Sequence, residues 1–220
     1  MLVVNSDRYD MRGLGGVLGR GARVGRMLKR AGGLERAAAE PLEPRVLLAL
    51  VEWDGGAGTD SWHDAQNWSG DAVPTEVDDV VIGESEVAVR IAGGAVARSL
   101  TTHTDLLVHG SLYELESVEL HARLTLGSGT NPGYLRFITG QDGLITGDGD
   151  VYLDYVGNGQ GSSISAWGAT LRIAEGIRVH GGGGQIYVNS GHLVIDGEVT
   201  ADRADRPIFL YATSNGATVT

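Results

Sequence analysis

Hydrophobic positions in the C-terminal part of the chain recur with an offset of 22 residues. Within one copy the apolar residues come as i, i+2 pairs separated by glycine-rich or polar residues, which is the alternation of short strands with one buried face. A fixed short period is typical of stacked repeats, because one copy cannot bury its apolar face alone. Each copy therefore predicts three short strands that form one coil. The six apolar pairs are Leu171/Leu193, Ile173/Ile195, Ile177/Val199, Val179/Ala201, Ile186/Ile208 and Val188/Leu210.

The predicted fold class is all-β, a right-handed parallel β-helix with about 22 residues per coil near the C-terminus. From Val87 onward short alternating runs follow one another without a helical period, and Leu106 and Val108 recur as Leu124 and Leu126. The right hand is expected from the intrinsic twist of strands. The alternative is an antiparallel β-sandwich or jelly roll, which needs hairpin turns and gives no reason for three strand pairs to recur together.

Composition and charge limit the possible functions. The 220 residues include 35 glycines, well above the average usage of about 7%, and no cysteine, so disulfides and thiolate metal sites are excluded. Residues 1–48 hold nine basic and five acidic side chains, a net charge of +4, and the remainder holds eight basic and 23 acidic, a net charge of −15. An acidic body repels nucleic acid, and the chain has no apolar run of about 20 residues that would span a membrane.

The basic N-terminal stretch predicts a leader over residues 1–51 that is disordered or helical. Its apolar run, residues 46–51, is shorter than an ordinary signal-peptide core. Residues 42–48 read Leu-Glu-Pro-Arg-Val-Leu-Leu, and this stretch resembles the LEPR-xLL motif near the N-terminus of many large exported planctomycete proteins. That resemblance implies sorting or processing, with a mature chain that starts around residues 51–53, whereas a basic arm that stays attached is the alternative. The motif residues are Leu42, Glu43, Pro44, Arg45, Leu47 and Leu48.

A tryptophan-rich segment over residues 52–86 follows the leader. Trp53, Trp62 and Trp68 are three of the four tryptophans in the chain. Large indoles suit a cap over the open end of a repeat array, although exposed indoles also stack on sugars. The segment resembles the W-GG-G-W-NW opening that precedes β-helical regions in many bacterial surface proteins, including autotransporter-like ones. We expect a cap here, followed by the β-helix over residues 87–220, which starts a further turn at its C-terminal end as a truncated β-helix would.

Candidate chemistry is sparse. Nucleophile-elbow, zincin and phosphate-loop motifs are absent from the sequence, so we predict no catalytic and no cofactor-binding residues. Residues 147–150 resemble calcium-binding β-roll repeats, and Asp148, Asp150 and Asp154 are therefore weak calcium candidates. The six histidines are scattered. His180 and His192 are expected at strand ends as solvated side chains rather than as metal ligands.

These patterns predict an exported, non-enzymatic, adhesin-like scaffold at the cell surface or outside the cell, with glycans or other surface proteins as partners. One alternative is a polysaccharide lyase or glycoside hydrolase built on a β-helix, with the aspartates and Arg172 or Arg178 as candidate groups. Another alternative is a fragment of a larger surface protein without an activity of its own. A groove with two converging carboxylates and an arginine would favour the enzyme, and flat polar faces would favour the scaffold.

Overall fold

The structure is a computed structural model, and it describes residues 49–155, 161–213 and 218–219. The leader and the LEPR-xLL motif residues therefore lie outside the described residues, apart from the last three positions of the expected range 1–51. The described residues belong to one compact unit. Within this unit the described strands pair in parallel, so the antiparallel alternative is wrong and the β-helix is confirmed as the fold.

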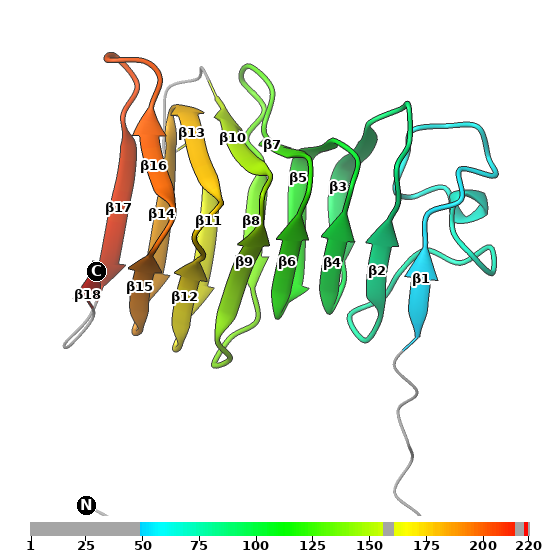
Figure 1. The fold of residues 1–220 in the computed structure, drawn as a ribbon, viewed down its shortest axis with the longest axis horizontal. Coiled ribbons are helices and arrows are strands. Elements are labelled where there is room, and N and C mark those ends of the chain that lie inside the picture. Colours follow the sequence, from blue (N-terminus) through cyan, green and yellow to red (C-terminus); the bar gives the residue numbers. More distant parts are fainter. Residues whose placement is uncertain (1–48, 156–160, 214–217, 220) are drawn as a thin grey trace, which may run out of the picture. The chain divides into compact units, whose positions relative to one another are not determined.

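One sheet of eight short strands runs along the whole stack (Figure 1). Each strand pairs in parallel with the strand one coil earlier and with the strand one coil later. We call this sheet face A. Its strands, in spatial order, are β1 (Leu50–Glu52), β2 (Asp79–Ile82), β4 (Ser99–Thr102), β6 (Ser117–Leu120), β9 (Gly143–Gly147), β12 (Thr170–Ile173), β15 (His192–Ile195) and β18 (Thr218–Val219).

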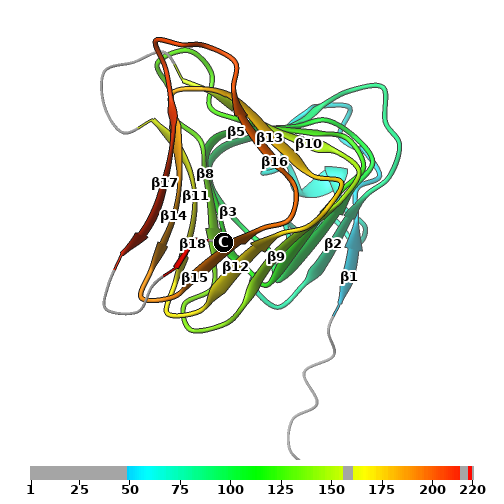
Figure 2. The ribbon, with the colours of Figure 1, turned by 60° about the vertical axis from the view of Figure 1, so that its left-hand side comes forward.

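The second sheet divides into two further faces, because its long strands β3 (Val89–Val96) and β5 (Leu106–Leu115) belong to both. The first half of β5 pairs with β7 and its second half with β8, so the sheet separates into two walls after the third coil. Figure 2 shows the three faces around the interior. Face B continues through β7 (Arg123–Leu126), β10 (Asp150–Asp154), β13 (Arg178–Gly182) and β16 (Glu198–Ala201), and face C through β8 (Tyr134–Phe137), β11 (Ser162–Trp167), β14 (Gly184–Asn189) and β17 (Ile208–Thr213).

The apolar repeat forms the core, as alternation predicts. Leu171 lies beside Leu193 in a parallel pair, both side chains are fully buried, and Ile173 lies beside Ile195. The described apolar side chains form one continuous cluster along the stack. The stacking of aliphatic layers is therefore confirmed at the 22-residue offset on face A.

The offset differs on the other two faces, and there four of the six expected pairs are wrong by two positions. Val179 pairs with Val199 on face B, an offset of 20, and Ile186 pairs with Leu210 on face C, an offset of 24. Between the aligned residues of faces A and B the chain advances five positions after Ile173 and three after Ile195, and between faces B and C it advances three positions after Gly181 and seven after Ala201. All these changes are even, so the same side chains still face inward.

The stack begins earlier than expected. β1 pairs with β2, and both strands precede residue 87, where we expected the β-helix to start. Val80 and Ile82 lie in β2, which falls within the range 52–86 that was expected to form the cap. At the other end, β18 pairs in parallel with β15, so a further coil begins there as predicted.

The tryptophan segment is tightly built. Trp62 and Trp68 are fully buried in the common core, and the Trp68 indole N–H donates to the Trp62 carbonyl at 2.6 Å. Trp53 packs edge-on against Trp68, with ring centroids 5.0 Å apart. Asn67, in the short 3-10 helix Ala65–Asn67, is also fully buried and binds the surrounding loop with both ends of its amide. These contacts hold the segment between β1 and β2 in a compact, ordered conformation. Among the described residues no helix is long and apolar enough to cross a membrane.

Candidate functional site

The three aspartates that the sequence suggested for calcium do not converge. Asp148 lies before β10 and binds His121 Nδ1 at 2.8 Å, while Asp150, at the start of β10, binds His180 Nε2 at 2.9 Å. Asp150 and Asp154 share the outward face of the extended strand β10, with Tyr152 between them. In the part of the chain that the structure describes, no group of three or more histidine, aspartate or glutamate side chains is arranged to hold a metal ion.

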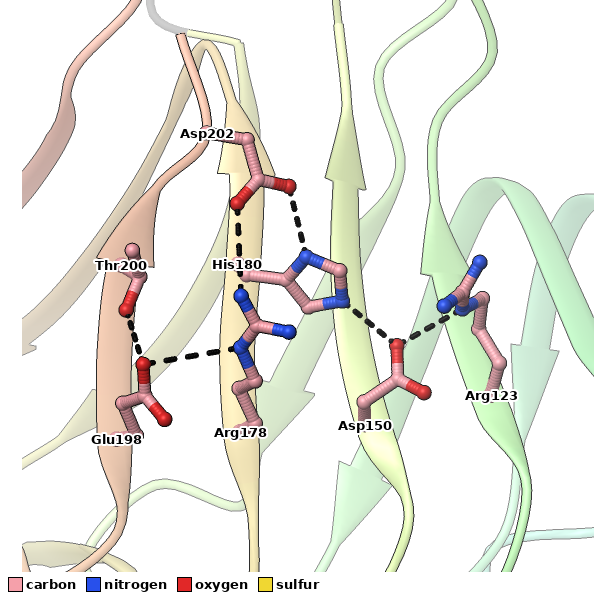
Figure 3. A network of polar contacts seen from close by, with 7 residues as sticks. All are labelled: Arg123, Asp150, Arg178, His180, Glu198, Thr200 and Asp202. Atoms are coloured by element: carbon pink, nitrogen blue, oxygen red, sulfur yellow. Dashed lines mark hydrogen bonds and ion pairs between the residues drawn. The ribbon is translucent and has the colours of Figure 1, made fainter.

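A dense polar site among the described residues is centred on His180, and the expectation of a solvated side chain at a strand end is wrong for this histidine. His180 lies within β13 and is 7% exposed. Its Nδ1 is 2.8 Å from Asp202 Oδ2, and its Nε2 is 2.9 Å from Asp150 Oδ2 (Figure 3). In each contact the carboxylate oxygen accepts, and the ring nitrogen that faces it donates when it carries a proton. The site is therefore an imidazole held between two carboxylates from different coils.

Arginines extend this site on both sides. Arg123 Nε donates to Asp150 Oδ2 at 2.8 Å, and Arg178 lies 3.7 Å from Asp202 Oδ1. Arg178 also lies 3.8 Å from Glu198 Oε1. We call the set Arg123, Asp150, Arg178, His180, Glu198, Thr200 and Asp202 the cross-coil network (Figure 3).

The register of face B produces the cross-coil network. Outward positions at the start of the four strands bring Arg123 beside Asp150, Asp150 beside Arg178 and Arg178 beside Glu198, so the charge alternates in sign from coil to coil. The next outward row places Tyr152 beside His180, with ring centroids 5.1 Å apart. Opposite charges on neighbouring strands stabilise a sheet. The network therefore bonds four successive coils through their outer side chains.

A groove of about 370 Å³ borders the network at the corner between faces A and B. It is lined by Arg178, Asp196 and Glu198 together with Gly176, Ile177 and Gly197. Each carboxylate already has a polar partner, because Asp196 lies 2.6 Å from Arg172 and Glu198 accepts from Thr200 at 2.6 Å. The corner therefore combines two carboxylates and an arginine, and each carboxylate is directed at a different partner.

A second histidine site lies at an earlier coil. His121 Nδ1 binds Asp148, its Nε2 is 3.2 Å from Glu119, and its ring stacks on His103 with centroids 4.4 Å apart. The hydrogen bond from Asp148 raises the pKa of His121 above 6.5, and Glu119 acts in the same direction, whereas partial burial opposes both. His121 is thus held more readily in its charged form than a free histidine.

The contacts of the two histidine sites with Asp148 and Asp150 were missed because the coil spacing there is 27 or 28 residues, so the 22-residue period does not align Asp150 with Arg178 or Asp148 with His121. The contact of His180 with Asp202 spans 22 residues and fits that period. An alternation signal that allowed corners of variable length would have placed β10 beside β13. Comparisons of the chain with protein-family models, with curated proteins and with solved structures found no match.

Proposed function

We propose that this chain is an exported, non-enzymatic β-helical scaffold that acts at the cell surface or outside the cell and binds glycans or other surface proteins. The LEPR-xLL resemblance supports export, and the W-GG-G-W-NW resemblance supports a surface protein. The parallel stack supports the scaffold role, because it presents side chains in long regular rows that suit multivalent contacts.

The observation that carries the proposal is the cross-coil network. Asp150 and Asp202 are the two carboxylates that meet at His180, and each also lies near an arginine. A general acid or base needs a proton that it exchanges with a substrate, and these groups direct their polar atoms at one another. Four coils joined in this way form a stiff wall, which favours a structural role for face B.

The second candidate function is that of a carbohydrate-active enzyme, favoured by the groove that Arg178, Asp196 and Glu198 line. A glycoside hydrolase uses two carboxylates across a sugar, and a lyase uses a basic group beside a stabilised carboxylate. In this reading Glu198 and Asp196 are the pair that would act on the substrate.

Polysaccharide depolymerisation separates the two functions. The full chain is incubated with neutral and uronate-containing polysaccharides, with and without Ca²⁺, and new reducing ends and unsaturated products are measured. The scaffold predicts binding without cleavage. Cleavage that is lost in Glu198→Gln but kept in Glu175→Gln, a glutamate outside the groove lining, would establish the enzyme instead. Export is tested by protease accessibility of the chain on intact source cells.

A further inference from the structure

A second groove, of about 490 Å³, lies on face C, away from the cross-coil network. It crosses the ends of β5, β8 and β11 and also includes Gly94 of β3, so four successive coils contribute to it. Phe137 is buried within its lining. Four larger side chains with aromatic or charged groups line the same groove, namely Tyr113, Glu114, Arg136 and Trp167.

The aromatic rings of this groove are accessible from outside. Tyr113 is 37% exposed, and Trp167 is half-buried with its edge against Tyr187 at a centroid distance of 5.4 Å. Gly94 leaves room for the Tyr113 ring, since a Cβ at Gly94 would lie 3.3 Å from a ring carbon. The two rings are therefore partly exposed in the groove and held by neighbouring residues of the stack.

Arg136 differs from the other arginines of the described chain. Each of the other described arginines lies within 4 Å of a carboxylate oxygen, whereas Arg136 forms no ion pair with any described residue. Its guanidinium lies 5.0 Å from the centre of the Tyr134 ring, a cation–π contact that leaves its N–H donors without a carboxylate. A positioned guanidinium without an acidic partner is available to hydrogen-bond a ligand in the groove.

Glu114 supplies acceptors on the same groove. Its backbone has a φ of 66°, a left-handed conformation that is uncommon for a residue with a side chain. Such outliers concentrate at binding and catalytic sites, where the surrounding structure holds them. One guanidinium and one carboxylate give the groove no net charge, within a chain whose residues 49–220 carry a net charge of −15.

We infer that the face C groove is a binding site for a neutral oligosaccharide. The two aromatic platforms would stack on the C–H faces of pyranose rings, the Arg136 guanidinium would donate to ring hydroxyls, and the Glu114 carboxylate would accept from them. Strands of successive coils lie about 4.8 Å apart, close to the length of one pyranose unit, so a chain of sugars can follow the stack. An acidic polymer is disfavoured by Glu114 and by the negative body. This inference rests on the proposed binding role and specifies its ligand class.

Calorimetric titration of the full chain tests the site. The probes are the hexaoses of cellulose, xylan, mannan and laminarin, with an oligogalacturonate as the acidic probe. We expect at least one neutral hexaose to bind, and Tyr113→Ala, Trp167→Ala and Arg136→Gln each to raise its Kd about tenfold, the factor that loss of one stacking or charged contact produces. The matched controls are Phe209→Ala, an exposed ring outside the groove lining, and Arg172→Gln, an exposed ion-paired arginine; both should leave Kd unchanged.

Two measurements keep the test independent of variant folding. Wild-type tryptophan fluorescence should change on addition of the hexaose, this change should disappear in Trp167→Phe, and Tyr113→Phe, which keeps the ring, should bind as wild type does. Absence of binding by every neutral hexaose, binding of the oligogalacturonate alone, or equal loss in the control variants would overturn the inference. If neutral sugars bind but the groove variants leave Kd unchanged, this site is wrong while the scaffold proposal stands; cleavage of the hexaose would remove the scaffold proposal itself.

Discussion

Replacement of His180 by alanine tests whether the cross-coil network stabilises the fold. The substitution removes two hydrogen bonds to carboxylates, and each such bond contributes about 1.5–3 kcal/mol to stability. Because the side chains of Asp150 and Asp202 keep 26% and 34% exposure, water replaces part of this interaction, and we expect about half of the gross value. Loss of the ring contact with Tyr152 adds about 0.5–1.5 kcal/mol. His180→Ala should therefore lower the free energy of unfolding by about 2–4 kcal/mol.

Urea unfolding followed by circular dichroism measures this loss. A double-mutant cycle with Asp150→Asn should give a coupling free energy of about 1 kcal/mol or more, since the two side chains share a hydrogen bond. The control His63→Ala changes an exposed histidine away from the network and should stay within about 0.5 kcal/mol of wild type. A loss below about 1 kcal/mol would refute the structural role. A gain in stability would point to chemistry, because residues held for catalysis often reduce stability.

Three further predictions concern other parts of the stack. Gly191→Ala should lower the free energy of unfolding, measured in urea, by at least about 1–3 kcal/mol. The reason is that the new Cβ would overlap the Ala169 carbonyl oxygen of the preceding coil. The control Gly83→Ala meets nothing within 4 Å and should be tolerated. NMR titration should give His121 a pKa above 6.5, and this pKa should fall in Asp148→Asn. Because the folded pKa is raised, the stability that this pair contributes is complete below pH 6.5 and is lost as pH rises through the folded pKa. An unchanged His121 pKa in Asp148→Asn would contradict the role of Asp148. Trp68→Phe should cost about 1–2 kcal/mol by thermal unfolding through the lost indole hydrogen bond, and an unchanged melting temperature would show that this bond adds nothing.

The sequence predicted the core of the fold because inward side chains obey a strict alternation. Leu171 and Leu193 stack as expected, and the even offsets kept the inward set correct where the register was wrong. Corners carry no such rule, since a turn of two residues and a turn of six both return the chain to the next face. The register of faces B and C therefore could not be read from one period.

The candidate sites were harder to predict for the same reason. Outward side chains follow no hydrophobic pattern, so the contacts of His180 with Asp150 and Asp202 depend entirely on the corner lengths between their strands. The groove at Tyr113 depends in addition on the irregular pairing of β5 with β8, where the register shifts between Leu112 and Leu115. An ordinary alternating pattern gives no warning of such an irregularity.

The unequal corner lengths have a consequence for how such a protein can change. A corner can lengthen or shorten without disturbing the layers inside, provided that the next strand keeps the same side chains facing inward. An insertion of two or four residues at a bend is thus tolerated, and a single residue added within a wall would turn its aliphatic row outward. New surface loops can accumulate at the bends of this molecule while its interior keeps the same composition.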